Sequence, residues 1–154
     1  MLQRIQSVLL LAATSLLIVL FRNPVSRISV TDQLIMEMNA FKIYALSGTG
    51  ADTISVWPFT VLLVIVMLIG IISIFLHKRR TLQMRLCMYN IFLMLGLVGL
   101  IWYFTKFTLN DLEGVQTAFL WPIVIPFISS VFTYLALKYI QRDDALVKSY
   151  DRLR

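Results

Sequence analysis

Residues 57–76 read WPFTVLLVIVMLIGIISIFL, an apolar run without a charged side chain. Fourteen of these residues are Leu, Ile, Val or Phe, and each such residue favours membrane insertion by about 0.3 to 0.6 kcal/mol. A helix of this length is about 30 Å long, which matches the hydrocarbon core of a bilayer. The run therefore predicts a transmembrane helix.

Three further apolar stretches, at residues 5–21, 86–104 and 120–140, also lack acidic side chains. The 154-residue chain is 59% hydrophobic and only 14% charged, whereas soluble domains carry about 25% charged residues. No small-x-small cleavage site follows Phe21, so we expect the first stretch to stay in the protein. The sequence predicts an all-α membrane protein, a single domain of residues 1–154 built as a four-transmembrane-helix bundle.

The basic residues predict the orientation of the chain. Ten of the fourteen lie on the side that holds the N-terminus, the connection 77–85 and the tail 141–154. Basic residues close to the spans mark the cytoplasmic side. We therefore expect a multi-pass protein of the bacterial cytoplasmic (inner) membrane with both termini in the cytoplasm, and no binding to nucleic acid.

The connection at residues 22–56 is too long for a simple loop. Residues 27–30 and 41–46 have strand character, and Ser47-Gly48-Thr49-Gly50 is typical of a turn. We expect a small cap that carries a short β-hairpin, with a helical turn at residues 32–39. On the same side, residues 110–113 (NDLE) match a helix capping box.

Three polar residues are candidates for contacts between the spans: Asn90, Gln6 and Ser7. An amide in hydrocarbon needs hydrogen-bond partners, so Asn90 is expected to face a neighbouring helix. Gly70 and Ser73 are small enough to allow close helix approach.

Interfacial residues form the second group of candidates. Trp57 and Trp121, each followed by proline, are expected to anchor the outer boundary. On the inner side, basic residues are candidates for contacts with lipid headgroups or a partner: Lys78, Arg79, Arg80 and Arg85. The tail is expected to continue the fourth helix or to lie along the membrane surface, with Asp143 and Asp144 within reach of Arg79, Arg80 and Arg85.

No catalytic, metal-binding or cofactor-binding pattern is found in the sequence. The single histidine, His77, has only basic neighbours, and the single cysteine, Cys87, has no base nearby in the sequence. We therefore expect no enzymatic activity and no cofactor.

Three segments carry a resemblance to a known family: residues 1–8 (MLQRIQSV), residues 78–90 (KRRTLQMRLCMYN) and residues 143–154 (DDALVKSYDRLR). In these segments the chain resembles an uncharacterised bacterial family of small four-span inner-membrane proteins, a domain of unknown function. The resemblance implies four spans and a bacterial inner membrane, and it implies no activity.

Three functions are compatible with this sequence. The leading hypothesis is a non-enzymatic accessory or scaffold protein that interacts with membrane lipids, a protein partner or further copies of itself. A small oligomeric transporter or channel is the alternative, although the spans lack the mid-depth charges that transport sites usually contain. A membrane-embedded lipid enzyme is the weakest hypothesis.

Overall fold

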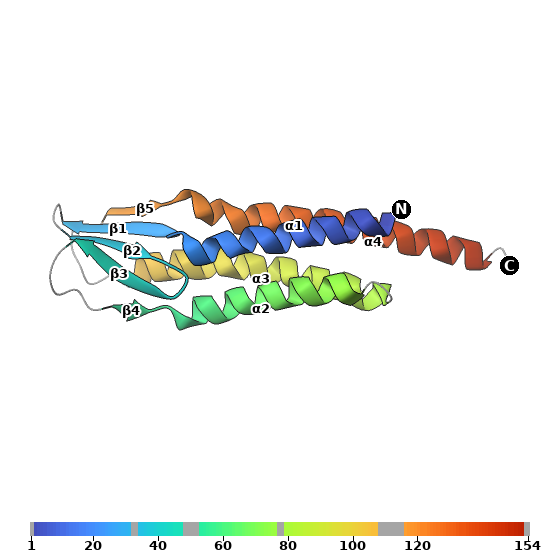
Figure 1. Cartoon of the computed structure of the whole chain (residues 1–154), viewed down its shortest axis with the longest axis horizontal. Helices are drawn as coiled ribbons and strands as arrows, with labels where there is room; N and C mark the ends of the chain where they lie inside the picture. The colour runs from blue at the N-terminus through green and yellow to red at the C-terminus, as the bar shows by residue number, and fades with distance from the viewer. Residues whose placement is uncertain (1, 32–33, 48–52, 77–78, 108–115, 153–154) are drawn as a thin grey trace.

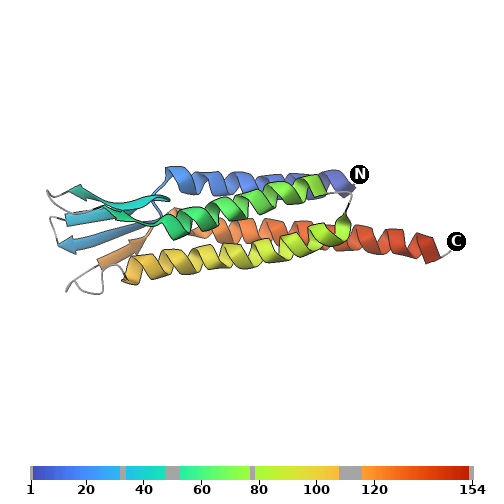
Figure 2. The ribbon, with the colours of Figure 1, turned by 90° about the horizontal axis from the view of Figure 1, so that it is seen from below.

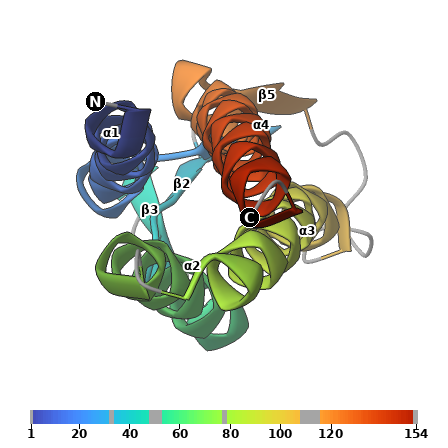
Figure 3. The same cartoon turned by 90° about the vertical axis from the view of Figure 1, so that its right-hand side faces the viewer.

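Four long helices run side by side and form a bundle (Figures 1 and 2). The computed structural model describes residues 2–31, 34–47, 53–76, 79–107 and 116–152. The helices are α1 (Leu2–Arg22), α2 (Trp57–Phe75), α3 (Arg80–Phe107) and α4 (Ile125–Arg152). Each contacts the next in chain order, and α4 closes the ring against α1 (Figure 3).

The outward faces of the helices are apolar, which is the reverse of a soluble bundle. Along α2 the exposed side chains include Ile65, Leu68 and Ile72, whereas Gly70 and Ser73 are buried. All four helices are long and apolar enough to cross a membrane. Apolar side chains on the outside are stable in lipid and unfavourable in water, so the fold indicates a multi-pass membrane protein.

A five-stranded antiparallel sheet covers one end of the bundle (Figure 1). Its strands are β1 (Ser26–Thr31), β2 (Leu34–Met38), β3 (Lys42–Ser47), β4 (Ile54–Ser55) and β5 (Gln116–Phe119). The order is β4-β3-β2-β1-β5. Strands β1 to β4 come from the connection between α1 and α2, and β5, which lies between α3 and α4 in the chain, pairs with β1 at one edge of the sheet. We call this end of the bundle the sheet end and the opposite end, which holds both termini, the open end.

The two faces of the sheet differ because side chains alternate along a strand. Ile28, Met36, Met38 and Ile43 are buried and continue the core of the helices, which includes Phe59. The sheet is thus one packed unit with the bundle.

The other face carries a polar row across β1, β2 and β3. Arg27 lies opposite Glu37, and Glu37 lies opposite Tyr44. The Arg27 Nη2 atom is 2.6 Å from Glu37 Oε1, and the Tyr44 hydroxyl donates to Glu37 Oε2 at 3.3 Å. Burial, followed by the negative charge of Glu37, raises the pKa of Tyr44 above its usual value of 10.0.

Hydrogen bonds attach the sheet to the helix ends. The Thr105 hydroxyl of α3 lies 3.1 Å from the Ser26 hydroxyl of β1, and Thr60 of α2 donates to the Ala40 carbonyl. The first contact gives the buried Ser26 hydroxyl a partner, and the second gives one to the carbonyl of buried Ala40.

The cap lies at the predicted end of the bundle, but it contains a five-stranded sheet instead of the predicted short hairpin. The strand character of residues 27–30 and 41–46 is confirmed by β1 and β3. The helical turn predicted at residues 32–39 is wrong, because Leu34–Met38 forms β2. Met36 and Met38 point into the core, whereas Glu37 between them points to the opposite face and is buried there beside Arg27 and Tyr44. This arrangement is that of a strand, which the short helical reading overlooked. The predicted turn at residues 47–50 extends beyond Ser47 into a segment outside the described residues. The predicted capping box at residues 110–113 lies wholly outside them.

The helix boundaries also differ from the predicted ones. Helix α3 begins at Arg80, six residues before the predicted span, so Arg80 and Arg85 lie on a helix instead of in a turn. The fourth span begins with the 3-10 helix η2 (Trp121–Val124), where Pro122 lies in the first turn, and continues as α4. Of the two expectations for the tail, the continuation of the fourth helix is confirmed, since α4 reaches Arg152.

Candidate functional site

A buried polar layer crosses the bundle where α1, α2 and α3 meet. Gly70 permits the close approach of α1 to α2, because a Cβ atom at position 70 would lie 2.1 Å from Thr14 Cγ2 and 3.7 Å from Asn90 Nδ2. Because real Cβ atoms do not come within 3 Å of a neighbouring atom, a side chain at position 70 would have to displace Thr14, and glycine is the residue that fits there without such a shift. The expected role of Gly70 in close helix approach is confirmed.

Asn90 is placed where the sequence predicted it, inside the bundle and facing other helices, with 2% of its surface exposed. Its Oδ1 atom accepts no hydrogen bond from the described residues. Gln6 is also buried, and its Nε2 atom likewise has no partner among them. These two atoms therefore do not bond each other, and Gln6 lies about 12 Å along α1 from Thr14. Ser7 is half-buried beside Gln6.

Gln83 is a further buried polar residue between α2 and α3 that sequence reasoning missed. Its Nε2 atom donates to the Ser73 carbonyl of α2 at 3.0 Å, and its side chain is only 2% exposed. The prediction had placed Gln83 in a turn. A polar residue one helical repeat before Asn90 was the available signal, because residues 83 and 90 share a helix face.

Hydroxyl groups on α4 complete the set of buried polar side chains. Thr133 is buried and donates to the Ser129 carbonyl at 2.8 Å. The Ser129 hydroxyl is buried and has no partner in the described part of the chain. An amide oxygen, an amide nitrogen and a hydroxyl thus remain available for water or a small polar ligand.

The described residues include no group of three or more His, Cys, Asp or Glu side chains that could hold a metal ion. Cys87 is buried in an apolar cluster with Leu10 and Ile140. His77 and Lys78 lie outside the described residues.

At the open end, one predicted contact of the tail is found. Arg80 Nη2 lies 3.1 Å from Asp143 Oδ2, and Arg80 Nη1 donates to the Asp143 carbonyl at 3.4 Å. These bonds hold α4 against the first turn of α3. Arg79 and Arg85 are exposed at the same end.

Both predicted anchors lie at the sheet end. Trp57 begins α2 and Trp121 begins η2, and both side chains are exposed. They therefore point away from the bundle at the level where the helices meet the sheet.

Helix α4 extends past the other three helices at the open end (Figures 1 and 2). Its 28 residues correspond to a length of about 42 Å. Leu146 and Val147 lie on this projecting part and are exposed.

The fold and the apolar outer faces define the class, a four-helix membrane protein with an antiparallel sheet at one end. Residues 2–153 match the family described as a domain of unknown function, DUF4293, and the chain belongs to this family. The resemblance seen in the sequence to an uncharacterised family is thereby confirmed. No curated protein matches the sequence.

Proposed function

We propose that the protein is a non-enzymatic accessory or scaffold protein of the bacterial cytoplasmic membrane, with both termini in the cytoplasm, which binds a partner protein through the projecting part of α4. One observation carries this proposal. Leu146 and Val147 are the last residues of the apolar segment Trp121–Val147, and they are exposed and follow Asp143, which contacts the first turn of α3; we place them outside the hydrocarbon core.

The distance along the helix supports this placement. From Trp121 to Leu146 the chain rises about 40 Å, given about 2.0 Å per residue in η2 and 1.5 Å in α4. The hydrocarbon core is only about 30 Å thick. Side chains of this kind face lipid within the core, but beyond it they are favoured only against a partner or a membrane surface.

The contact between Arg80 and Asp143 supports a defined binding surface. It fixes α4 just before the projecting part, so the apolar side chains have a set direction. A preordered helix loses less conformational entropy on binding than a flexible tail would.

Photo-crosslinking in cells tests the proposal. A photoreactive residue at Val147 should give a discrete protein adduct, and Leu146→Asp should abolish it. The matched control is a photoreactive residue at Val131, which is exposed on the spanning part of the same helix. Identical adducts at both positions, or an adduct that survives Leu146→Asp, would contradict the scaffold role.

A small oligomeric transporter or channel is the second candidate, and the buried polar layer favours it. Asn90 and Ser129 each have a polar atom inside the bundle that has no partner among the described residues, which is a feature of sites that bind polar solutes. Against it, the described spans carry charged side chains only near their ends, at residues such as Arg85 and Lys138. Flux of small polar solutes into proteoliposomes that is abolished by Asn90→Leu would support transport over the scaffold role.

A further inference from the structure

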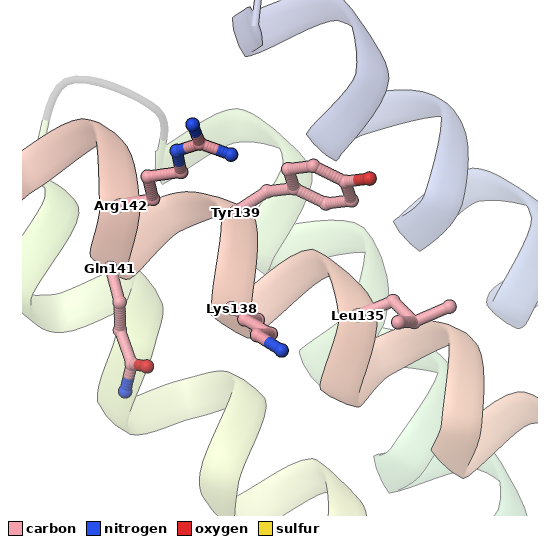
Figure 4. A pocket seen from close by; sticks show the side chains of 5 residues that line it. All are labelled: Leu135, Lys138, Tyr139, Gln141 and Arg142. Atoms are coloured by element: carbon pink, nitrogen blue, oxygen red, sulfur yellow. The ribbon is translucent and has the colours of Figure 1, made fainter.

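A hollow of about 610 Å³ opens along α4, and its described lining residues include none of the buried polar residues above. The described residues that line it all come from this helix: Leu135, Lys138, Tyr139, Gln141 and Arg142 (Figure 4). Four of them recur at the spacing of one helix face, positions 135, 138, 139 and 142. The ring of Tyr139 points toward α1, and Lys138 points away from it (Figure 4). The volume falls within the range of about 300–1,000 Å³ that is typical of ligand sites.

The hollow has two cationic side chains, and no carboxylate of the described residues pairs with either. Arg27 and Arg80 each have an ion pair, with Glu37 and Asp143. Lys138 and Arg142 have none within the part of the chain that the structure describes, and both are exposed. Unpaired cations in a hollow with a phenol and an amide are suited to an anionic group that accepts several hydrogen bonds.

The depth of the hollow matches the boundary of the bilayer. Lys138 lies about 28 Å and Arg142 about 34 Å along the helix from Trp121, at the rises of 3-10 and α-helices. With Trp121 at one boundary of a core about 30 Å thick, the cations lie at the other boundary. Leu135, at about 23 Å, lies within the hydrocarbon. The part of the hollow within the hydrocarbon is thus apolar, and the part at the membrane boundary is basic.

We propose that this hollow binds an anionic phospholipid. The phosphate lies between Lys138 and Arg142, which share a face of α4, and an acyl chain follows Leu135 into the hydrocarbon. A free phosphate would use the cations but would leave the apolar part unfilled. The site does not depend on the scaffold role, since Leu146 and Val147 lie outside it.

Native mass spectrometry of the full chain, released from nanodiscs of mixed phosphatidylglycerol and phosphatidylcholine, tests the site. The native protein should retain phosphatidylglycerol preferentially. The double variant Lys138→Gln, Arg142→Gln should reduce this preference about tenfold or more, because each basic residue at the surface contributes about 1 kcal/mol. The control Arg79→Gln, Arg85→Gln removes the same charge at the same end, outside the hollow. It weakens the general attraction to an anionic surface but removes no contact within the hollow, so the released protein should lose less of its preference than the Lys138→Gln, Arg142→Gln variant does. Equal losses in the two variants, or no preference in the native protein, would overturn the proposal.

The acyl-chain contact separates a lipid from a free anion. Leu135→Asn should weaken retention of phosphatidylglycerol, whereas Leu146→Asn, which changes another exposed leucine of α4 outside the hollow, should not. Both side chains are exposed, so both variants are expected to fold, and thermal unfolding checks this. Displacement of the lipid by inorganic phosphate alone, together with an unchanged Leu135→Asn variant, would show an anion site and would overturn the lipid assignment.

Discussion

The two ends of the bundle satisfy their buried polar groups differently. At the sheet end, Thr105 bonds Ser26, and Glu37 receives bonds from both Arg27 and Tyr44. Toward the open end and in the middle of the bundle, single atoms of Gln6, Asn90 and Ser129 have no partner among the described residues, whereas at the sheet end this holds for Asn39 Oδ1 alone. Side-chain bonds therefore satisfy more of the buried polar groups at the sheet end, and the rest of the bundle keeps more polar capacity and exposed surface for other molecules.

The largest effect is expected where the bundle is tightest. Gly70→Val should lower the free energy of unfolding by about 3 kcal/mol, because its side chain would overlap Thr14 and force α1 and α2 apart. Thermal unfolding in detergent measures the loss.

Two further variants make this prediction specific. Gly99→Ala should be neutral, since no atom lies within 4 Å of a Cβ at that position. Thr14→Ala should recover most of the stability of a Gly70→Ala variant by removing the overlapping methyl group. A stable Gly70→Val protein would show that α1 and α2 are not in close contact.

The next effect tests the polar row of the sheet. Glu37→Ala should destabilise the sheet end by about 1–2 kcal/mol, because it removes hydrogen bonds to a charged group while Arg27 stays half exposed to water. Hydrogen exchange of β1 and β2 should accelerate, while exchange in the middle of α3 stays unchanged. Lys42→Ala, an exposed residue on β3, provides the control. If both variants exchange alike, the row does not stabilise the sheet.

A smaller effect is expected at the open end. Asp143→Lys should cost about 1 kcal/mol or less, because the pair with Arg80 is partly exposed. It should also increase proteolysis of the projecting part of α4. Arg80→Glu combined with Asp143→Lys should restore protection; continued proteolysis in this double variant would argue against the pair.

The smallest effect concerns pH at the sheet end. The pKa of Tyr44 is raised by burial and by Glu37, so the folded sheet favours the neutral phenol. This stabilisation is complete below the pKa of the unfolded chain, about 10, and is lost as pH rises through the higher folded pKa. Stability measured from pH 8 to 11 should therefore fall more steeply for the native protein than for Tyr44→Phe. Parallel curves would contradict the shift.

Sequence reasoning located the four helices because each apolar run is long and free of acidic residues, as in residues 57–76. It also placed Asn90 inside the bundle correctly. It did not find β5, since Gln116–Phe119 reads as a short loop until its partner β1 is known. Strand pairing between distant segments depends on register, which a local pattern does not contain. The start of α3 was misplaced because four basic residues between 78 and 85 suggested a turn, although Arg is a good helix former.

The pairing of Ser26 with Phe119 also has a consequence for biosynthesis. Translation proceeds from the N-terminus, so β1 is complete before the ribosome has made α2 and α3. Its edge toward β5 stays unpaired until two more spans have crossed the membrane and returned the chain to the same side. Closure of the sheet is therefore a late step, limited by a contact of large sequence separation, and only chains that have inserted their first three spans in the correct sense reach it.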